Sequence, residues 1–149
     1  MKGTLRGSSV DRAIVLFKIE SLERRVDRVQ SKVPQTSREL AQDLDAQDVI
    51  VLNLERVVQL CVDIAAHVVA DLKTPAPMTM AEGFDGLHKA GVIDEGVAQR
   101  MKKAVGFRNI AVHEYRTINW DVVYSIMTER LDDFRQYAAA IVRWMDTHG

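Results

Sequence analysis

Proline divides the chain into segments, and within these segments the apolar residues recur with a helical period. The prolines are Pro34, Pro75 and Pro77, and residues 35–74 contain neither Gly nor Pro. Strands rarely exceed about ten residues, so this interval is predicted to be helical, including its β-branched run at 49–52. Its later part carries one apolar stripe with alternating spacings of four and three: Leu54, Val58, Cys61, Ala65, Val68 and Leu72.

Residues with the chemistry of helix N-caps mark where the helices are expected to begin. Such a residue accepts a hydrogen bond from a free backbone N–H group, and a Glu three positions later can return the bond. The expected starts are Thr36 with Glu39, Thr79 with Glu82, Asp94, and either Asn119 or Asp121. The helix after Thr79 is expected to end near Gly91, and the helix after Asp94 near residue 113.

The first and last parts of the chain show the same helical spacing. Between residues 11 and 32 the apolar positions are Ile14, Phe17, Leu22, Val26 and Val29. In the last helix they are Trp120, Val123, Met127, Leu131, Phe134, Ala138, Ile141 and Met145. No segment shows the sustained alternation that marks a half-buried strand. We therefore predict an all-α bundle of about five helices, two of them long, as a single domain over residues 11–149 after a flexible N-terminus over residues 1–10.

Composition agrees with this fold class and excludes several others. The chain has 149 residues, of which 47% are hydrophobic and 28% charged, as in an average globular domain. The sequence has no apolar run long enough for a membrane span and no secretory signal. The single cysteine, Cys61, excludes an internal disulfide and a multi-cysteine zinc site, suits a reducing cytoplasm, and is interpreted as a small buried hydrophobe.

The net charge of −1 hides an uneven distribution. Residues 1–38 carry nine Lys or Arg and four Asp or Glu, which gives +5; residues 39–99 carry three and eleven, which gives −8. Residues 100–149 carry eight and six, which gives +2, and five of these bases fall within residues 100–116 beside one acid, Glu114. Such a segment can attract phosphate, although most charge runs are solvated helix faces.

The candidate chemistry lies in residues 105–116. Arg108 falls on the apolar phase of its helix, where a guanidinium is costly unless it is paired or functional. Gly106 lies inside the same helix, and its missing Cβ would permit close approach by a backbone or a ligand. On a regular helix His113 is rotated about 140° from Arg108. The two side chains converge only if the helix ends or unwinds near His113, or if they come from two chains.

Structural explanations remain open for these residues. His113 could be a cation favoured by the dipole at a helix C-terminus. Arg108 could form a buried ion pair with an acid of the long helix: Asp48, Glu55 or Asp63.

The remaining histidines, acids and tryptophans favour structural roles. Asp63, His67 and Asp71 repeat every four residues on one helix face, but no further His or Cys is placed to complete a metal site. A salt-bridged or solvent-facing row is expected, and no metal site is predicted. His88, near a helix end, is expected at the surface, and His148 is expected in the C-terminal tail. Trp120 and Trp144 fall at or beside the apolar face of the last helix and are expected as core or interface anchors.

The order Arg108-Asn109-x-x-x-His113-x-Tyr115 resembles the R-x-x-x-x-H-x-Y motif of the HEPN superfamily, in the version typical of its HepT branch of toxins. Residues 52–67, 80–87 and 106–109 also resemble that branch, and the likeness covers about residues 11–145. The resemblance implies a helical bundle that dimerises through the motif helices.

The resemblance also implies a function, a toxin of a toxin–antitoxin pair that acts as a metal-independent endoribonuclease without a cofactor. Arg108 and His113 would be catalytic, Asn109 would orient His113 or a phosphate, and Tyr115 would line the cleft. The implied partner is a minimal nucleotidyltransferase antitoxin, which transfers AMP to the motif tyrosine, here Tyr115. Two alternatives remain: a non-catalytic HEPN-like dimer that binds a nucleotide or a partner protein, and a structural bundle with a buried Arg–carboxylate pair.

Overall fold

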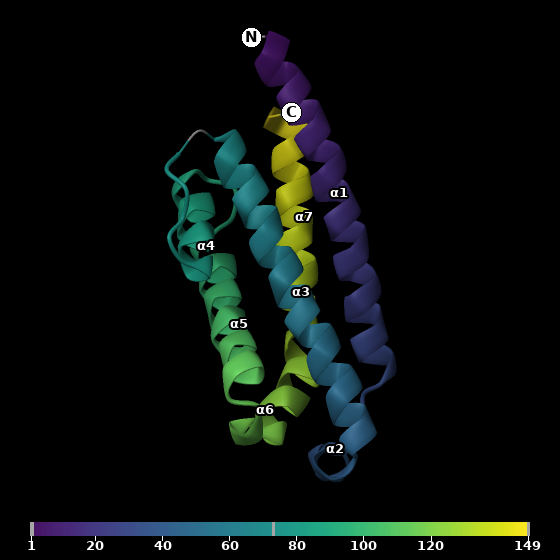
Figure 1. Cartoon of the computed structure of the whole chain (residues 1–149). Helices are drawn as coiled ribbons and strands as arrows, with labels where there is room; N and C mark the ends of the chain where they lie inside the picture. The colour runs from purple at the N-terminus through teal and green to yellow at the C-terminus, as the bar shows by residue number, and fades with distance from the viewer. Residues whose placement is uncertain (1, 73, 149) are drawn as a thin grey trace.

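The computed structural model describes residues 2–72 and 74–148, with side chains from residue 12 onward, and every regular element in these ranges is helical. The elements are α1 (Lys2–Ser31), α2 (Ser37–Gln42), α3 (Leu44–Asp71), α4 (Met80–Lys89), α5 (Glu95–His113), the 3-10 turn η1 (Tyr115–Thr117), α6 (Trp120–Ser125), the π-helical turn η2 (Ile126–Arg130) and α7 (Leu131–His148). Helices α1, α3 and α7 run along an elongated bundle, α4 and α5 cover one side, and α2 and α6 lie at the end away from the termini (Figure 1). The all-α prediction is confirmed.

Four of the predicted N-caps are confirmed: Thr36, Thr79, Asp94 and Asn119. At the first of them, Thr36 Oγ1 accepts a hydrogen bond from the N–H of Glu39 at 3.1 Å, and the Glu39 carboxylate accepts one from the N–H of Gln35 at 3.1 Å. Asn119 rather than Asp121 starts the last helix, because its side chain accepts hydrogen bonds from the N–H groups of the first turn. Local chemistry therefore sets where these helices begin.

The interval over residues 35–74, predicted to be helical, contains two helices, α2 and α3, so the expected number of helices is corrected. Asp43 has extended backbone angles, and its side chain accepts a hydrogen bond from the N–H of Ala46 at 3.0 Å, which starts α3. Because α6, η2 and α7 follow one another without a break, the described residues form six continuous helical stretches rather than about five. Three of these stretches are long, where two were expected.

The apolar stripes of α3 and the last helix lie in the core, but the stripe predicted for the first helix is partly wrong. Phe17 is 67% exposed, and Ile14 is exposed as well. The buried residues of α1 follow a regular spacing of four and three: Val15, Ile19, Leu22, Val26 and Val29. The helical phase set by the last three of these residues continues to Val15 and Ile19, so Ile14 and Phe17 face outward.

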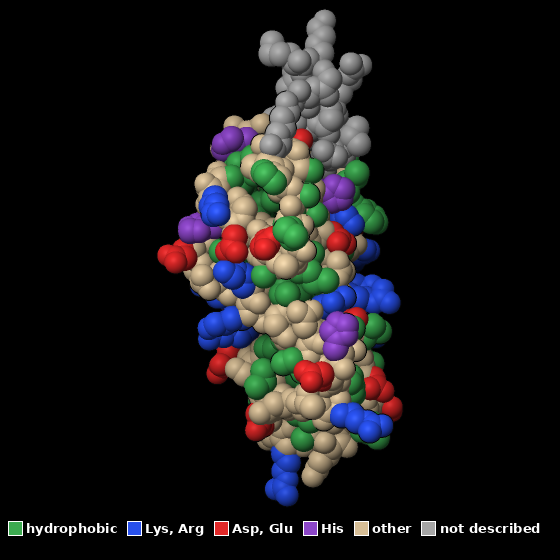
Figure 2. Space-filling model, turned by 60° about the vertical axis from the view of Figure 1, so that its left-hand side comes forward, with side chains coloured by type: hydrophobic (Ala, Val, Ile, Leu, Met, Phe, Trp, Pro, Cys, Tyr) green, Lys and Arg blue, Asp and Glu red, His purple; other side chains and the backbone are tan. Residues whose placement is uncertain are grey.

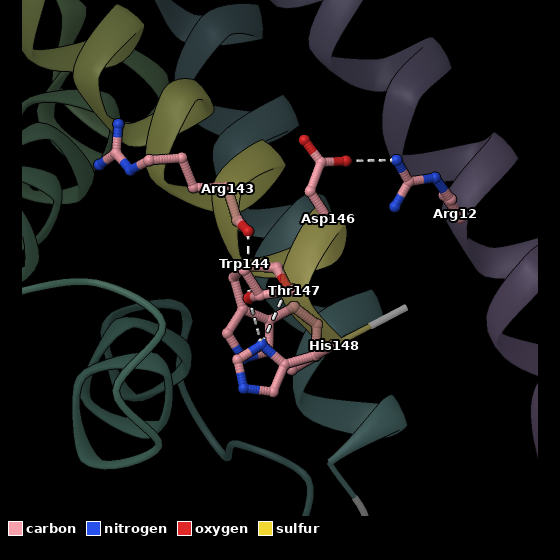
Figure 3. Close-up of polar contacts among 6 residues, drawn as sticks. All are labelled: Arg12, Arg143, Trp144, Asp146, Thr147 and His148. Carbon is pink, nitrogen blue, oxygen red and sulfur yellow. Dashed lines mark hydrogen bonds and ion pairs between the residues drawn. The ribbon is translucent and has the colours of Figure 1, made fainter.

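One ion pair joins the C-terminal end of α7 to α1, and the other polar contacts there lie within α7. Arg12 Nη2 lies 2.6 Å from Asp146 Oδ1 (Figure 3). The His148 ring stacks on Trp144 at a centroid distance of 4.9 Å, and its Nδ1 lies 2.9 Å from the Trp144 carbonyl oxygen. These residues are therefore engaged in contacts that tie down the end of the helix.

The flexible N-terminus expected over residues 1–10 stays a prediction. Helix α1 begins at Lys2, but residue 1 and the side chains of residues 2–11 lie outside the described part of the chain. Among the described helices, none combines the length and the apolar character that crossing a membrane requires.

Candidate active site

Helix α5 carries the basic motif, and its Arg108 has no hydrogen-bond or ion-pair partner among the described residues. The side chain is half-buried, as its place on the apolar phase predicts, and its Nε is buried without an acceptor. Of the acids considered as partners, Asp48 bonds to Tyr115 and Asp63 pairs with a lysine of α1. The guanidinium of Arg108 is therefore left available for an anion from outside the chain.

Helix α5 stays regular to its last residue, His113. The N–H of the following residue, Glu114, donates to the carbonyl of Ile110 at 2.8 Å. Arg108 and His113 thus lie five positions apart on one regular helix, and their directions differ by about 140°. Asn109 and His113 are both exposed. The helix does not unwind before His113, so within one chain the two motif side chains point to different sides.

The surface of α5 beside the motif is open and partly apolar. Ile110, about 40° from Gly106 around the helix, is 41% exposed, and Val112, which points about 160° away from Ile110, is 40% exposed. A Cβ added at Gly106 would meet no atom within 4 Å, so no described part of the same chain makes the close approach that this glycine permits. On the α4–α5 side of the molecule, hydrophobic side chains remain visible among Lys and Arg side chains (Figure 2). This face can receive a second molecule.

Tyr115 lies just beyond α5, in the η1 turn that leads to α6. Its Oη donates a hydrogen bond to Asp48 Oδ1 on α3 at 2.9 Å, and its ring stands edge-on to Trp120 at a centroid distance of 6.1 Å. Burial, and then the hydrogen bond to the Asp48 carboxylate, raise the pKa of the phenol to about 12. The side chain is 39% exposed, so the neutral hydroxyl is held in place and can still be reached from solvent.

Sequence reasoning missed the contact between Asp48 and Tyr115. It considered Asp48 only as a partner for Arg108. The two residues are 67 positions apart, and only the packing of the η1 end of the bundle against α3 brings them together. No local pattern in the sequence marks such a contact.

The other candidate residues take structural positions. In the row from Asp63 to Asp71, Asp63 lies 3.6 Å from Lys18 Nζ and accepts a hydrogen bond from Gln59 at 3.0 Å. Within the described ranges, no group of three or more His, Cys, Asp or Glu side chains could hold a metal ion. Cys61 is buried as predicted, and burial raises the pKa of its thiol, while His88 is exposed near the end of α4.

Comparisons with known proteins point to one family. A family model described as ribonuclease HepT-like matches residues 22–141. The mRNA nuclease HepT of Shewanella oneidensis is 34% identical over 128 residues, which cover 86% of this chain and 96% of that protein. The tRNA nuclease HepT of Aphanizomenon flos-aquae is 22% identical over 140 residues, which cover 94% of this chain and 95% of that protein.

Solved structures agree with this relationship. The tri-AMPylated HEPN toxin of Shewanella oneidensis, in complex with its MNT antitoxin, superposes with a TM-score of 0.81 at 33% identity, covering 87% of this chain and 97% of that one. The cytosolic protein YutE of Bacillus subtilis, of unknown function, is only 14% identical with a TM-score of 0.80, and shows the fold alone. The family match, over residues 22–141, covers most of the sequence. The chain therefore belongs to the HepT-like family of the HEPN superfamily.

Proposed function

We propose that this protein is the toxin of a toxin–antitoxin pair, an endoribonuclease that cleaves RNA without a metal ion in a site built by two copies of the chain. The observation that carries the proposal is Arg108, a half-buried guanidinium whose Nε has no partner among the described residues. An unpaired, partly buried charge is costly to fold, so its retention suggests a group held for an anionic ligand. The similarity to nucleases that act on mRNA and tRNA directs the proposal to the phosphates of RNA.

The chemistry fits the residue types of the motif. RNA supplies its own nucleophile, the ribose 2′-hydroxyl, so cleavage needs a base near that hydroxyl, an acid at the leaving 5′-oxygen and positive charge at the phosphorus. His113 transfers protons, because an imidazole changes its charge near neutral pH. Arg108 binds the phosphate with its planar fork and stabilises the developing charge. Asn109 orients His113 or a phosphate oxygen by hydrogen bonding.

A second copy of the chain would supply what one copy lacks. One chain offers a single motif histidine, whereas the reaction needs both an acid and a base. In a two-fold dimer through the open face of α5, the His113 of one copy can approach the Arg108 of the other, although they diverge within each chain. The exposed Ile110, which lies about 40° from Gly106 around the helix, and the open surface at Gly106 support this face as the interface.

The proposed partner is a nucleotidyltransferase antitoxin that transfers AMP to Tyr115. The similar Shewanella toxin is AMPylated and was solved in complex with an MNT antitoxin. Here the Tyr115 hydroxyl is reachable from solvent and lies directly after the motif helix. An added AMP would bring a negative phosphodiester and a bulky nucleoside to a cleft that binds phosphate, so it would oppose RNA entry by repulsion and by size.

The test of the nuclease is a cleavage assay on RNA in the presence of a metal chelator. We expect the parent protein to cleave and His113→Ala to cleave at least about a hundredfold more slowly, since general acid–base catalysis contributes about 10²–10⁴ in rate. Lys103→Ala is the matched control, because it removes an exposed charge from the same helix outside the motif. Cleavage that needs an added metal, or that survives in His113→Ala, would contradict the proposal. RNA or nucleotide binding without any cleavage would favour the non-catalytic alternative.

The test of neutralisation is the variant Tyr115→Phe. It keeps the aromatic ring and removes the acceptor of AMP, so we expect it to arrest growth even when the antitoxin and ATP are present. Neutralisation of this variant by the antitoxin would show that another residue, or binding alone, is sufficient.

A further inference from the structure

The hydroxyl of Tyr115 is held by one specific acceptor on another helix. Its Oη donates to Asp48 Oδ1 at 2.9 Å, which is the distance at which a carboxylate can take a proton from a reacting hydroxyl. Asp48 itself is an exposed residue of α3, so a nucleotide bound at Tyr115 would meet the carboxylate and the hydroxyl together. No other hydrogen bond to the Tyr115 side chain occurs among the described residues.

The structure restrains both partners of this contact. Next to Asp48, the buried Gln47 donates from its side chain to the carbonyl of Leu40 at 2.9 Å, which fixes the start of α3 against α2. On the other side, Thr117 donates to the carbonyl of Glu114 through both its backbone N–H and its hydroxyl at 2.8 Å, which closes the η1 turn. The carboxylate and the phenol are therefore presented to each other before any ligand arrives.

A phenol held in this way needs a proton acceptor before it can act as a nucleophile. Burial and the Asp48 contact raise the pKa of Tyr115 to about 12, so almost no phenolate is present at neutral pH. A neutral hydroxyl that attacks phosphorus becomes acidic as the new bond forms. A carboxylate at hydrogen-bond distance can then accept the proton, as the catalytic Asp of protein kinases does for a substrate hydroxyl.

We propose that Asp48 is the general base for AMP transfer to Tyr115, so that the modified chain supplies a catalytic group for its own modification. Tyr115 Oη attacks the α-phosphorus of ATP, the new O–P bond forms, and the bond between the α-phosphorus and the bridging oxygen breaks. Pyrophosphate leaves with the bonding electrons, and the phenolic proton passes to Asp48 Oδ1. This inference rests on the proposed modification of Tyr115 by a nucleotidyltransferase.

The same geometry gives the modification a structural consequence. Once adenylated, Tyr115 Oη has no proton to donate, and its phosphodiester places a negative charge beside the Asp48 carboxylate. Both changes act against the contact seen in the unmodified chain, and the ring is released from α3. Because the ring stands edge-on to Trp120, the release should be visible in the tryptophan fluorescence of the protein.

The experiment compares AMP uptake in single-turnover reactions of the full chain with the nucleotidyltransferase, Mg²⁺ and ATP labelled at the α-phosphate. We expect Asp48→Asn, which keeps an acceptor oxygen but is a far weaker base, to take up AMP at least about a hundredfold more slowly at saturating ATP. Asp45→Asn is the matched control, because it makes the same change on an exposed carboxylate in the first turn of the same helix. Far-UV circular dichroism and antitoxin affinity check that each variant is folded and binds its partner.

A second variant separates base catalysis from a structural role. Asp48→Ala leaves space beside the hydroxyl, and added formate should restore a measurable fraction of the lost rate in this variant but not in Tyr115→Phe. Uptake within threefold of the parent in Asp48→Asn, or loss without formate rescue in Asp48→Ala, would overturn the inference. Loss of RNA cleavage in Asp48→Asn with unchanged AMP uptake would also overturn it. If the parent chain itself takes up no AMP, the proposed modification of Tyr115 has failed, and the inference falls with it.

Discussion

Two arginines on α5, two turns apart, differ in what surrounds them. Both Arg100 and Arg108 are half-buried. Arg100 Nε lies 3.2 Å from Asp133 Oδ1 on α7, and its Nη2 donates to Gln136 Oε1 at 3.1 Å. The Nε atoms of both arginines are buried without a well-formed hydrogen bond, but Arg108 also has no ion pair and no other side-chain hydrogen bond among the described residues. The same side chain on the same helix is thus tied to α7 at one position and left without a partner among the described residues at the other.

The two halves of α5 repeat this difference. In the first half, Lys102 pairs with Asp85 of α4 at 3.0 Å, and Val97, Ala98 and Met101 are buried. In the second half, from Gly106 to His113, only Ala111 is buried, Phe107 and Arg108 are half-buried, and the other five residues are exposed. The first half therefore anchors the helix in the bundle, and the second half presents the motif.

The largest effect should come from removing the unpartnered arginine. We expect Arg108→Ala to reduce RNA cleavage by at least about a hundredfold, since a charge that contacts the phosphate in the transition state is lost. The melting temperature of the variant should stay close to that of the parent, because no hydrogen bond or ion pair among the described residues is lost. Cleavage kinetics and a thermal melt on one preparation measure the rate of RNA cleavage and the melting temperature. A large fall in melting temperature with normal cleavage would assign Arg108 to the fold instead.

The next largest effect should come from Arg100, whose loss should lower the stability of the protein rather than its activity. Arg100→Ala leaves Asp133, whose side chain is only 17% exposed, without its cation, and should lower the free energy of unfolding by about 1–2 kcal/mol. Cleavage per folded molecule should stay within a few-fold of the parent. Denaturant titration measures the first quantity and active-site-normalised kinetics the second. An activity loss as deep as that of Arg108→Ala would remove the distinction between the two arginines.

A smaller effect is expected at Gly106. The position has open space for a Cβ, and replacing Gly by Ala inside a helix stabilises it by about 0.5–1 kcal/mol. At protein concentrations low enough to keep single chains, Gly106→Ala should therefore raise the midpoint of denaturant unfolding. The same variant should weaken self-association if a second copy approaches the helix closely there. Unfolding at an unchanged or lower midpoint would show that this glycine is needed within the chain.

The smallest expected effect is on the pKa of the Tyr115 phenol, which a pH titration measures. The pKa of Tyr115 is raised from its usual 10.0 to about 12, so the folded state favours the neutral phenol. The stabilisation from this group is complete below about pH 10 and is lost as the pH rises through about 12. The difference in phenolate absorbance between the parent and Tyr115→Phe should reveal this high midpoint, and Asp48→Asn should lower it. A midpoint near 10 in the parent would mean that the burial of the phenol and its contact with Asp48, which together raise the pKa, do not persist in solution.

Sequence alone predicts the features that depend on neighbours along the chain. The caps at Thr36, Thr79 and Asp94 and the stripe from Leu54 to Leu72 are local, because they follow from side-chain chemistry and helical period. Phe17 was misplaced because the predicted stripe included Ile14 and Phe17, although the helical phase of Leu22, Val26 and Val29 continues to Val15 and Ile19, which are buried.

The site was predictable to the extent that its motif is contiguous in sequence. The half-burial of Arg108 and the exposure of His113 follow from their positions on α5. The partner of Tyr115 does not, because Asp48 lies on another helix and reaches the phenol only through the tertiary fold. The proposed pairing of two α5 faces is harder still to predict from the sequence, because it depends on the surfaces of two folded copies.

The central claim is that the open half of α5 is completed by a second copy of the chain. Because the single native cysteine, Cys61, is buried, a cysteine introduced at the surface is the only accessible thiol. With a short bifunctional thiol reagent, Asn109→Cys should form covalent dimers efficiently, while Phe17→Cys, at an exposed position on α1, should stay monomeric. Cross-linking at Phe17→Cys with none at Asn109→Cys would place the partner elsewhere and contradict the account.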